Sequence, residues 1–183
     1  MKSFRDSFHE LQSVKSLTVT SLLLALSVAL GFYQVQLTDF IRISFSYLPH
    51  ELASMFFGPV VGGIFGGAMD ILKYLVNPTG AFFPGFTISA IVNGLIYGVV
   101  LYKKPLHPVR VLAANGLSSI IVSLGLNTYW LTVLYGNGFM AILPARVTQQ
   151  LVMFPITSVL FFLVAKVLLK ANVMDLVRGK SAS

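Results

Sequence analysis

The sequence predicts an all-α integral membrane protein, a compact bundle of six transmembrane helices, one of them short, with both termini in the cytoplasm. The chain is 56% hydrophobic and 10% charged, whereas soluble domains carry about 25% charged residues. Its hydrophobic residues gather in segments near the length that crosses a bilayer, roughly 20 residues. Most of its basic residues fall in three places that can share one side of a membrane.

Three parts are expected along the chain. Residues 1–16 form a cytoplasmic or interfacial segment with an apolar side that includes Phe4 and Phe8. This segment lacks the apolar core and cleavage site of a signal peptide, so we expect it to be retained. Residues 17–170 form the six-helix transmembrane domain, and residues 171–183 form a basic cytoplasmic tail. The chain has no cysteine, which excludes disulfides, cysteine-ligated metals and thiol catalysis.

The first predicted span covers residues 17–34. In it Ala25 and Ala29 lie one helical turn apart among leucines. Small residues at this spacing form a strip that another helix can approach closely. The alternative is that the two alanines are ordinary residues of an apolar helix. Residues 36–47 then alternate apolar and polar, which predicts an extended connection at the membrane surface.

A short helix is expected from Pro49 to residue 57, because proline suits the first turn of a helix. Gly58-Pro59 bends the chain, and residues 60–76 form the next span. Glycines recur every four residues through this region, which predicts close packing against another helix. They are Gly58, Gly62 and Gly66, together with Gly63 and Gly67.

The backbone breaks again at residues 77–85, which contain Asn77-Pro78 and Pro84-Gly85. Irregular backbone at membrane depth survives where it lines a cavity, so this stretch is expected to cover a polar pocket. The remaining segments are a span at 86–102, a basic turn at 103–110, a span at 112–134 interrupted by the cluster Asn127–Trp130, a turn at 136–138 and a last span within 140–169.

Ten of the thirteen basic residues lie in the N-terminal segment, in the 103–110 turn or in the C-terminal part of the chain from Lys166 onward. Their clustering predicts that these parts are cytoplasmic. It also accounts for the formal charge of +7 without a nucleic-acid partner. Arg42, Lys73 and Arg146 are left in the outer half, where topology does not require them.

These three cations are candidates for binding an anion, because arginine can hold a carboxylate through two parallel hydrogen bonds. Asp70 and Lys73, three residues apart, can instead form a mutually neutralised pair. Polar and aromatic side chains at the same depth could bind and stack on a flat heteroaromatic ring. They are Phe82, Phe83, Phe86, Thr87, Asn93, Asn127, Tyr129 and Trp130. A ligand with a planar polar ring and an anionic tail would fit both the cations and these polar and aromatic side chains.

Catalytic signatures are missing. His50-Glu51 begins like a zinc motif, but Ser54 stands where the second histidine is required. An intramembrane enzyme that uses Asp70 and His50, and a transporter that works alone, stay open as alternatives. The sequence shows no ATP site, so energised transport would need a partner.

Four stretches together resemble the folate-specific substrate-binding (S) component of energy-coupling factor transporters, a family of bacterial importers. They are RISFSYLP from Arg42, the stretch from Gly58-Pro59 to Asp70, FPGFT from Phe83 and LNTYWL from Leu126. The resemblance covers residues 17–169. The pair Ala25 and Ala29 is similar to the small-residue motif by which the family docks on its coupling subunit.

The resemblance implies a six-helix membrane protein that captures folate with high affinity from outside the cell. Its partners would be a transmembrane coupling subunit, two cytoplasmic ATPases that hold ATP and magnesium, and the lipid bilayer. This chain itself would hold no cofactor or metal. The S component would topple in the membrane to release folate, with residues 36–47 and 77–85 as gates. An S component for another small vitamin is the alternative within the family.

Overall fold

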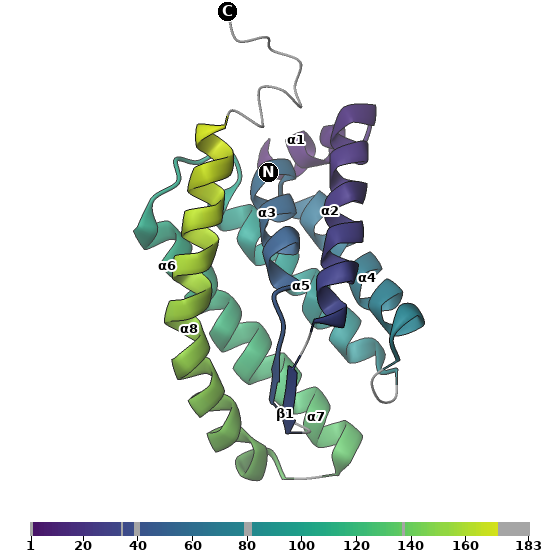
Figure 1. Ribbon diagram of the computed structural model, residues 1–183, viewed down its shortest axis with the longest axis vertical. Helices are drawn as coiled ribbons and strands as arrows, with labels where there is room; N and C mark the ends of the chain where they lie inside the picture. The colour runs from purple at the N-terminus through teal and green to yellow at the C-terminus, as the bar shows by residue number, and fades with distance from the viewer. Residues whose placement is uncertain (1, 34, 39–40, 79–81, 137, 172–183) are drawn as a thin grey trace, which may run out of the picture.

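The computed structural model describes residues 2–33, 35–38, 41–78, 82–136 and 138–171. Nearly all of these residues are helical, and the long helices run side by side along one axis (Figure 1). The elements in chain order are α1 Lys2–Glu10, α2 Val14–Phe32, β1 Val35–Thr38, β2 Ile41–Ile43, α3 Tyr47–Phe57, α4 Pro59–Val76, α5 Pro84–Leu101, α6 Pro108–Ser118, η1 Ser119–Asn127, α7 Thr128–Tyr135 and α8 Phe139–Lys170.

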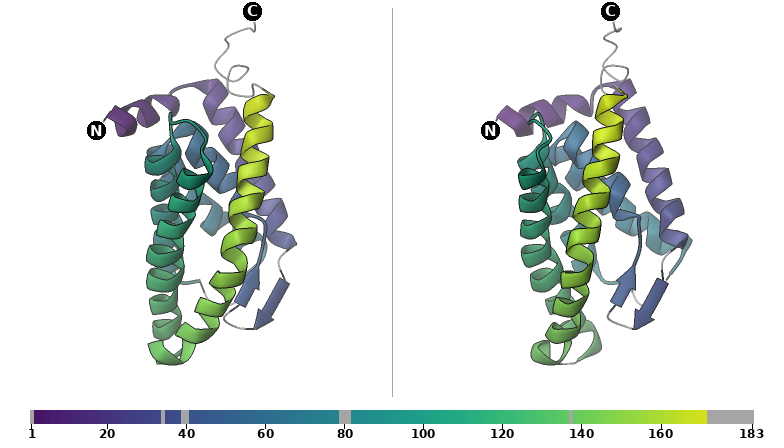
Figure 2. Two further views of the ribbon diagram at one scale, coloured as in Figure 1. Left: turned by 90° about the vertical axis from the view of Figure 1, so that its left-hand side faces the viewer. Right: turned by 60° about the vertical axis from the view of Figure 1, so that its left-hand side comes forward.

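Five of the described helices are long and apolar enough to cross a membrane: α2, α4, α5, the continuous α6–η1–α7 rod and α8. No more than 39% of any of these segments is buried inside the protein, so their apolar side chains are suited to lipid. With the short α3 they make the six segments that the sequence predicted. The α1 helix lies across one end of this bundle (Figure 2).

The connection between α2 and α3 is a β-hairpin at the opposite end of the bundle (Figure 1). β1 pairs antiparallel with β2, with Val35 opposite Ile43 and Gln36 opposite Arg42. The extended conformation predicted from the alternating pattern is thus confirmed for these strands. Helix α3 begins at Tyr47, two residues before the proline that was expected to open it.

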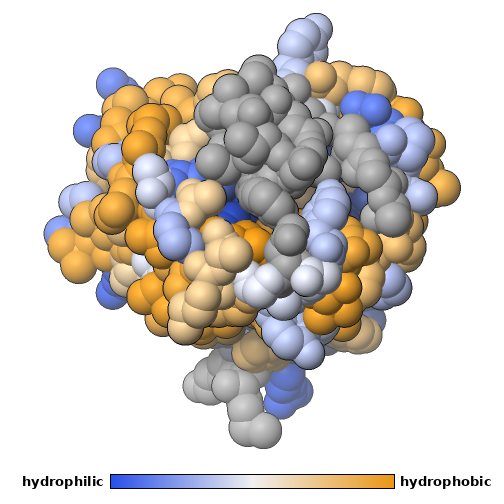
Figure 3. All heavy atoms as spheres, turned by 90° about the horizontal axis from the view of Figure 1, so that it is seen from below, coloured by the Kyte–Doolittle hydropathy of each residue, from blue (hydrophilic) through white to orange (hydrophobic). Residues whose placement is uncertain are grey.

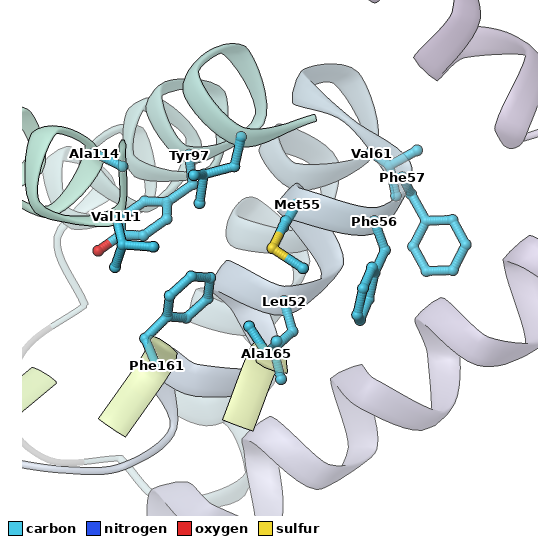
Figure 4. Packing of buried hydrophobic residues seen from close by; sticks show 11 residues of the cluster. Leu52, Met55, Phe56, Phe57, Val61, Tyr97, Val111, Ala114, Phe161 and Ala165 are labelled. Atoms are coloured by element: carbon cyan, nitrogen blue, oxygen red, sulfur yellow. The ribbon is translucent and has the colours of Figure 1, made fainter. Parts of the chain in front are cut away.

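The buried α3 helix is the centre of the core. Every residue from Pro49 to Phe57 is buried. The core cluster joins α3 to α4, α5, α6 and α8 (Figure 4), and consists of Leu52, Met55, Phe56, Phe57, Val61, Tyr97, Leu101, Val111, Ala114, Phe161 and Ala165. A helix of eleven residues is only about 16 Å long at 1.5 Å per residue. It therefore fills only part of the length of the bundle.

Helices α4 and α5 approach so closely that their backbones touch. A Cβ atom on Gly62 or Gly94 would collide with the backbone of the other glycine, and one on Gly66 would collide with the Ala90 carbonyl. The predicted close packing of glycines against another helix is therefore confirmed for Gly62 and Gly66. Gly63 differs, because a Cβ there would lie 3.5 Å from Ile91, an ordinary contact.

The surface helix α1 is tied to the start of α4 through Ser7. The Ser7 hydroxyl donates to the Phe57 carbonyl at 2.7 Å and accepts from the N–H groups of Val60 and Val61 at 3.1 and 3.2 Å. Helix starts leave N–H groups without helical partners, and Gly58 has no side chain to cap them. Ser7 thus caps α4 from a separate helix.

A second contact joins α1 to the turn after α5. The Lys103 ammonium donates to the Asp6 carboxylate at 2.7 Å. This hydrogen bond lowers the pKa of Asp6 below its ordinary value. The contact places the basic 103–110 turn at the same end of the molecule as α1.

The polar and aromatic cluster Asn127–Trp130, which interrupts the hydrophobic run of the fifth segment, does not break its helix. Helix α7 continues directly from η1, and the rod runs unbroken from Pro108 to Tyr135. The irregular part of this rod is the π-helix η1, which ends at Asn127.

The α4–α5 contact predicts a difference between two glycines. Gly94→Ala should lower the free energy of unfolding by about 2 kcal/mol, within the range for overpacked interiors, because the new methyl meets backbone that cannot move aside. Gly63→Ala is the matched control and should cause no loss. Thermal unfolding of both purified variants measures this, and equal melting temperatures would contradict it.

Candidate functional site

A cavity of about 420 Å³ lies toward the hairpin end of the bundle. Viewed from that end, strongly hydrophilic residues lie near the middle of the protein and hydrophobic residues surround them (Figure 3). Seven elements line the cavity. The lining residues with polar or aromatic side chains are Phe32, Ser46, Tyr47, His50, Asp70, Lys73, Tyr74, Asn77, Phe82, Phe83, Phe86, Ser89, Asn93, Asn127, Tyr135 and Arg146.

The wall formed by α4 carries one acidic and one basic side chain, each with a neutral partner. The Thr87 hydroxyl donates to Asp70 Oδ2 at 2.7 Å, and Lys73 Nζ donates to Ser46 Oγ at 2.5 Å. No ion pair joins Asp70 to Lys73 in the described structure, so the mutually neutralised pair is not formed. Asp70 and Lys73 both face the cavity.

Two amides contribute to the walls formed by α5 and η1. The Ser118 hydroxyl donates to Asn93 Oδ1, which fixes that amide between α5 and α6. Asn127 lies at the end of η1, and its Oδ1 is buried with no hydrogen-bond partner among the described residues. A buried acceptor without a partner is costly, so a ligand donor at this position would stabilise the complex.

Arg146 enters the cavity from the second turn of α8. Its Nη2 donates to the Ser123 carbonyl at 3.2 Å, and Nη1 lies 3.4 Å from Gln149 Oε1. Its side chain lines the same cavity as Lys73 and Asp70, and the role of these three residues in ligand binding stays a prediction. The side chain of Arg42 lies outside the described residues, so its predicted role stays a prediction.

Aromatic rings gather where α5 begins. Phe82, Phe83 and Phe86 line the cavity, and the Phe83 ring lies 5.6 Å from the ring of Trp130. The Trp130 indole donates to Ser89 Oγ at 3.2 Å. Trp130 and Thr87 thus stand behind the lining and support it. Tyr129 packs on Trp130 at 5.0 Å but is 53% exposed, so it lies outside the cavity.

Two further side chains of the lining come from α3 and were not among the predicted site residues. Tyr47 lines the cavity with its hydroxyl buried and without a hydrogen-bond partner in the described structure. His50 Nε2 donates to the Gly62 carbonyl at 3.1 Å, and its ring stacks on Phe65. Tyr47 lies inside the stretch from Arg42 to Pro49 that carries the resemblance, which was the available signal.

The cavity has the attributes of a binding site for an organic anion. Ionisable side chains inside a membrane are costly and mark functional sites. Among the described lining residues Lys73 and Arg146 are basic and Asp70 is acidic. The volume is within the range of sites for small molecules, about 300–1,000 Å³. The described residues contain no group of three His, Asp or Glu side chains arranged to hold a metal.

Comparison with known proteins identifies the family. Residues 15–165 match the family described as "ECF transporter, substrate-specific component". The chain belongs to this family. Such a component is a multi-pass protein of the bacterial cell membrane that binds a substrate, so the S component described here is not an enzyme.

The S component is 38% identical to the "Folate transporter FolT" of Clostridium novyi (strain NT) over 144 residues, which are 79% of this chain and 83% of that protein. It is 30% identical to the "Folate transporter FolT" of Leuconostoc mesenteroides subsp. mesenteroides over 148 residues, 78% of this chain and 80% of the relative. A crystal structure of FolT bound with folic acid superimposes with a TM-score of 0.79 at 31% identity, covering 84% of this chain and 94% of that one.

The outer face of α2 in this S component is apolar and exposed. Ala25 and Ala29 both lie on it, beside Leu22, which is 70% exposed, and Leu26, which is 48% exposed. The buried side of α2 is instead formed by Ser16, Ser27 and Gly31. This arrangement leaves the alanine strip accessible to another helix, and its role in docking stays a prediction.

Proposed function

We propose that this chain is the folate-binding S component of an ATP-driven importer. The observation that carries the proposal is the cavity, which combines aromatic rings, amides and an excess of basic side chains. Folate has the matching chemistry, a flat polar ring with an anionic glutamate tail. Relatives at 38% and 30% identity are named folate transporters, which supports the same ligand here.

Ligand capture takes place from the outer side in this proposal. The described basic residues Arg5, Lys103 and Lys104 belong to α1 or to the turn tied to it. Positive residues favour the cytoplasmic side, so this end faces inward and both termini are cytoplasmic. The hairpin end, where the cavity lies, then faces outward.

Each group of lining side chains has a different role in ligand capture. The rings of Phe83 and Phe86 offer stacking surface for the ligand ring. The amides of Asn93 and Asn127 offer hydrogen bonds to its edge, and Arg146 or Lys73 would hold a carboxylate of the tail. The short α3 closes the cavity on its inner side with Tyr47 and His50, so the ligand is not in contact with the cytoplasm in this state.

Delivery requires partners. We infer that the exposed α2 face with Ala25 and Ala29 docks on a transmembrane coupling subunit, and that two cytoplasmic ATPases supply the energy with their own ATP and magnesium. The S component then topples in the membrane to release folate inward. The small side chains permit close approach of a partner helix.

The direct test is calorimetric titration of the purified chain with a panel of vitamins that contains folate, riboflavin, thiamine and biotin. We expect folate to bind without ATP or any partner. If another vitamin binds and folate does not, the chain is an S component for that vitamin.

Replacing the arginine at the cavity wall should weaken binding. Arg146→Ala should reduce the free energy of folate binding by about 2–3 kcal/mol, the scale for a buried hydrogen bond to a charged group. Arg110→Ala, near the cytoplasmic end of α6, is the control and should leave the dissociation constant unchanged. Equal affinity of the Arg146→Ala variant and the wild type would remove Arg146 from the site.

The docking face should separate binding from transport. Ala25→Trp and Ala29→Trp should leave folate affinity intact and abolish ATP-dependent uptake into vesicles that contain the whole transporter, because only the subunit contact is blocked. Ala113→Trp places the same side chain on an exposed position of α6 and should permit uptake. Uptake that survives at both α2 positions would show that this face is not the dock.

A further inference from the structure

The π-helix η1 is the most unusual backbone in the molecule. It spans nine residues in the middle of the α6–η1–α7 rod, whereas π-helix usually occurs as single turns, frequently at functional sites. On one side of η1, the Asn115 amide fastens α6 to α8 by donating to the Phe154 carbonyl at 3.1 Å and to Ser158 Oγ at 2.6 Å. On the other side, Asn127 and Leu131 line the cavity. The π-helix η1 thus lies between the Asn115 contact with α8 and the residues of the rod that line the cavity.

Within η1, two serines bind one glutamine of α8 at both ends of its amide. Gln150 Nε2 donates to Ser119 Oγ at 2.6 Å, and Ser123 Oγ donates to Gln150 Oε1 at 2.9 Å. An amide that has both its oxygen and its nitrogen bonded is fixed in orientation. These bonds lock α8 against η1 at this level.

Arg146 is held by the same part of η1. Gln150 is four residues after Arg146, so the two side chains share one face of α8. Arg146 Nη2 donates to the Ser123 carbonyl at 3.2 Å and lies 3.5 Å from Ser123 Oγ. The Ser123 carbonyl also accepts from Thr128 Oγ1 at 3.2 Å. A continuous series of hydrogen bonds therefore runs from Ser119 through Gln150 and Ser123 to the guanidinium at the cavity wall.

We propose that Ser123 and Gln150 are positioning residues for ligand binding: together with η1 they hold the Arg146 guanidinium in the orientation that meets the anionic end of the ligand. Neither side chain lines the cavity, so each acts through Arg146. A long arginine side chain has many rotamers, and fixing it before the ligand arrives reduces the entropy that binding must supply. The inference rests on the proposed function, because it concerns the same cavity and an anionic ligand.

A double-mutant cycle on the full chain tests this inference. Gln150→Leu removes both amide bonds at nearly constant volume, and Ser123→Ala removes the hydroxyl that orients Gln150. Each change is made alone and together with Arg146→Ala, and the folate dissociation constant is measured by calorimetry. Each single change should weaken folate binding about tenfold, as expected for coupled residues in contact. In the Arg146→Ala background each should have almost no further effect.

Two variants separate positioning from general packing. Ser123→Thr keeps the hydroxyl and should retain wild-type affinity. Ser158→Ala removes a serine from the contact of Asn115 with α8, which joins the same rod to α8 but involves no residue of the cavity lining, and this variant should also retain wild-type affinity. The unfolding temperature of every variant is also recorded. If Ser123 and Gln150 had a purely structural role, their replacement would lower the unfolding temperature, and the loss of folate affinity would be the same with and without Arg146.

Two outcomes would overturn the inference. One is that Gln150→Leu and Ser123→Ala leave folate affinity unchanged. The other is that they weaken it by the same factor in the presence and in the absence of Arg146. Failure of the proposed function would look different, since the wild-type chain itself would not bind folate. The same cycle would then be measured with the vitamin that does bind.

Discussion

The length of α3 is the constraint on which the rest of the structure depends. This helix lies at the centre of the bundle with every residue from Pro49 to Phe57 buried, yet at about 16 Å it covers roughly half of a bilayer core about 30 Å thick. The C-terminal part of α3 contributes Met55 and Phe57 to the hydrophobic core, which also contains Tyr97 of α5. Beyond the other end of α3 the surrounding helices continue without a central partner, and the cavity occupies that space.

The hydrogen-bond partners of the polar side chains around the cavity reflect the same membrane environment. Lipid offers no hydrogen bonds, so polar side chains at membrane depth must find partners inside the bundle. Asp70 has Thr87, Asn93 has Ser118, and Lys73 has Ser46. Each of these contacts joins two segments around the cavity. The groups that could contact a ligand are therefore also part of what holds the walls together.

Much of the fold could be predicted from the sequence, because membrane spans and glycine repeats are local signals. The glycines of α4 meet α5 as their spacing indicated, and the short helix and extended connection were anticipated. The actual partners of Asp70 and Lys73 were not predictable, because the choice of Thr87 and Ser46 depends on how segments distant in the sequence pack together. The π-helix was missed for a similar reason, since its sequence, SIIVSLGLN, is compatible with an ordinary apolar helix. Tyr47 and His50 were missed because only the packing of α3 turns them toward the cavity.

The Ser7 contact fastens the surface helix α1 to the junction between α3 and α4. Its one hydroxyl serves the Phe57 carbonyl and the first N–H groups of α4, at a break where Gly58 has a φ of 91° and offers no cap of its own. Shortened versions of the chain that begin at α2 would leave the Phe57 carbonyl and the N–H groups of Val60 and Val61 without this hydrogen-bond partner. Helix α4 begins at the Ser7 contact and carries Asp70 and Lys73 of the cavity wall toward its other end, so the seating of this one helix links the surface helix α1 to the binding site.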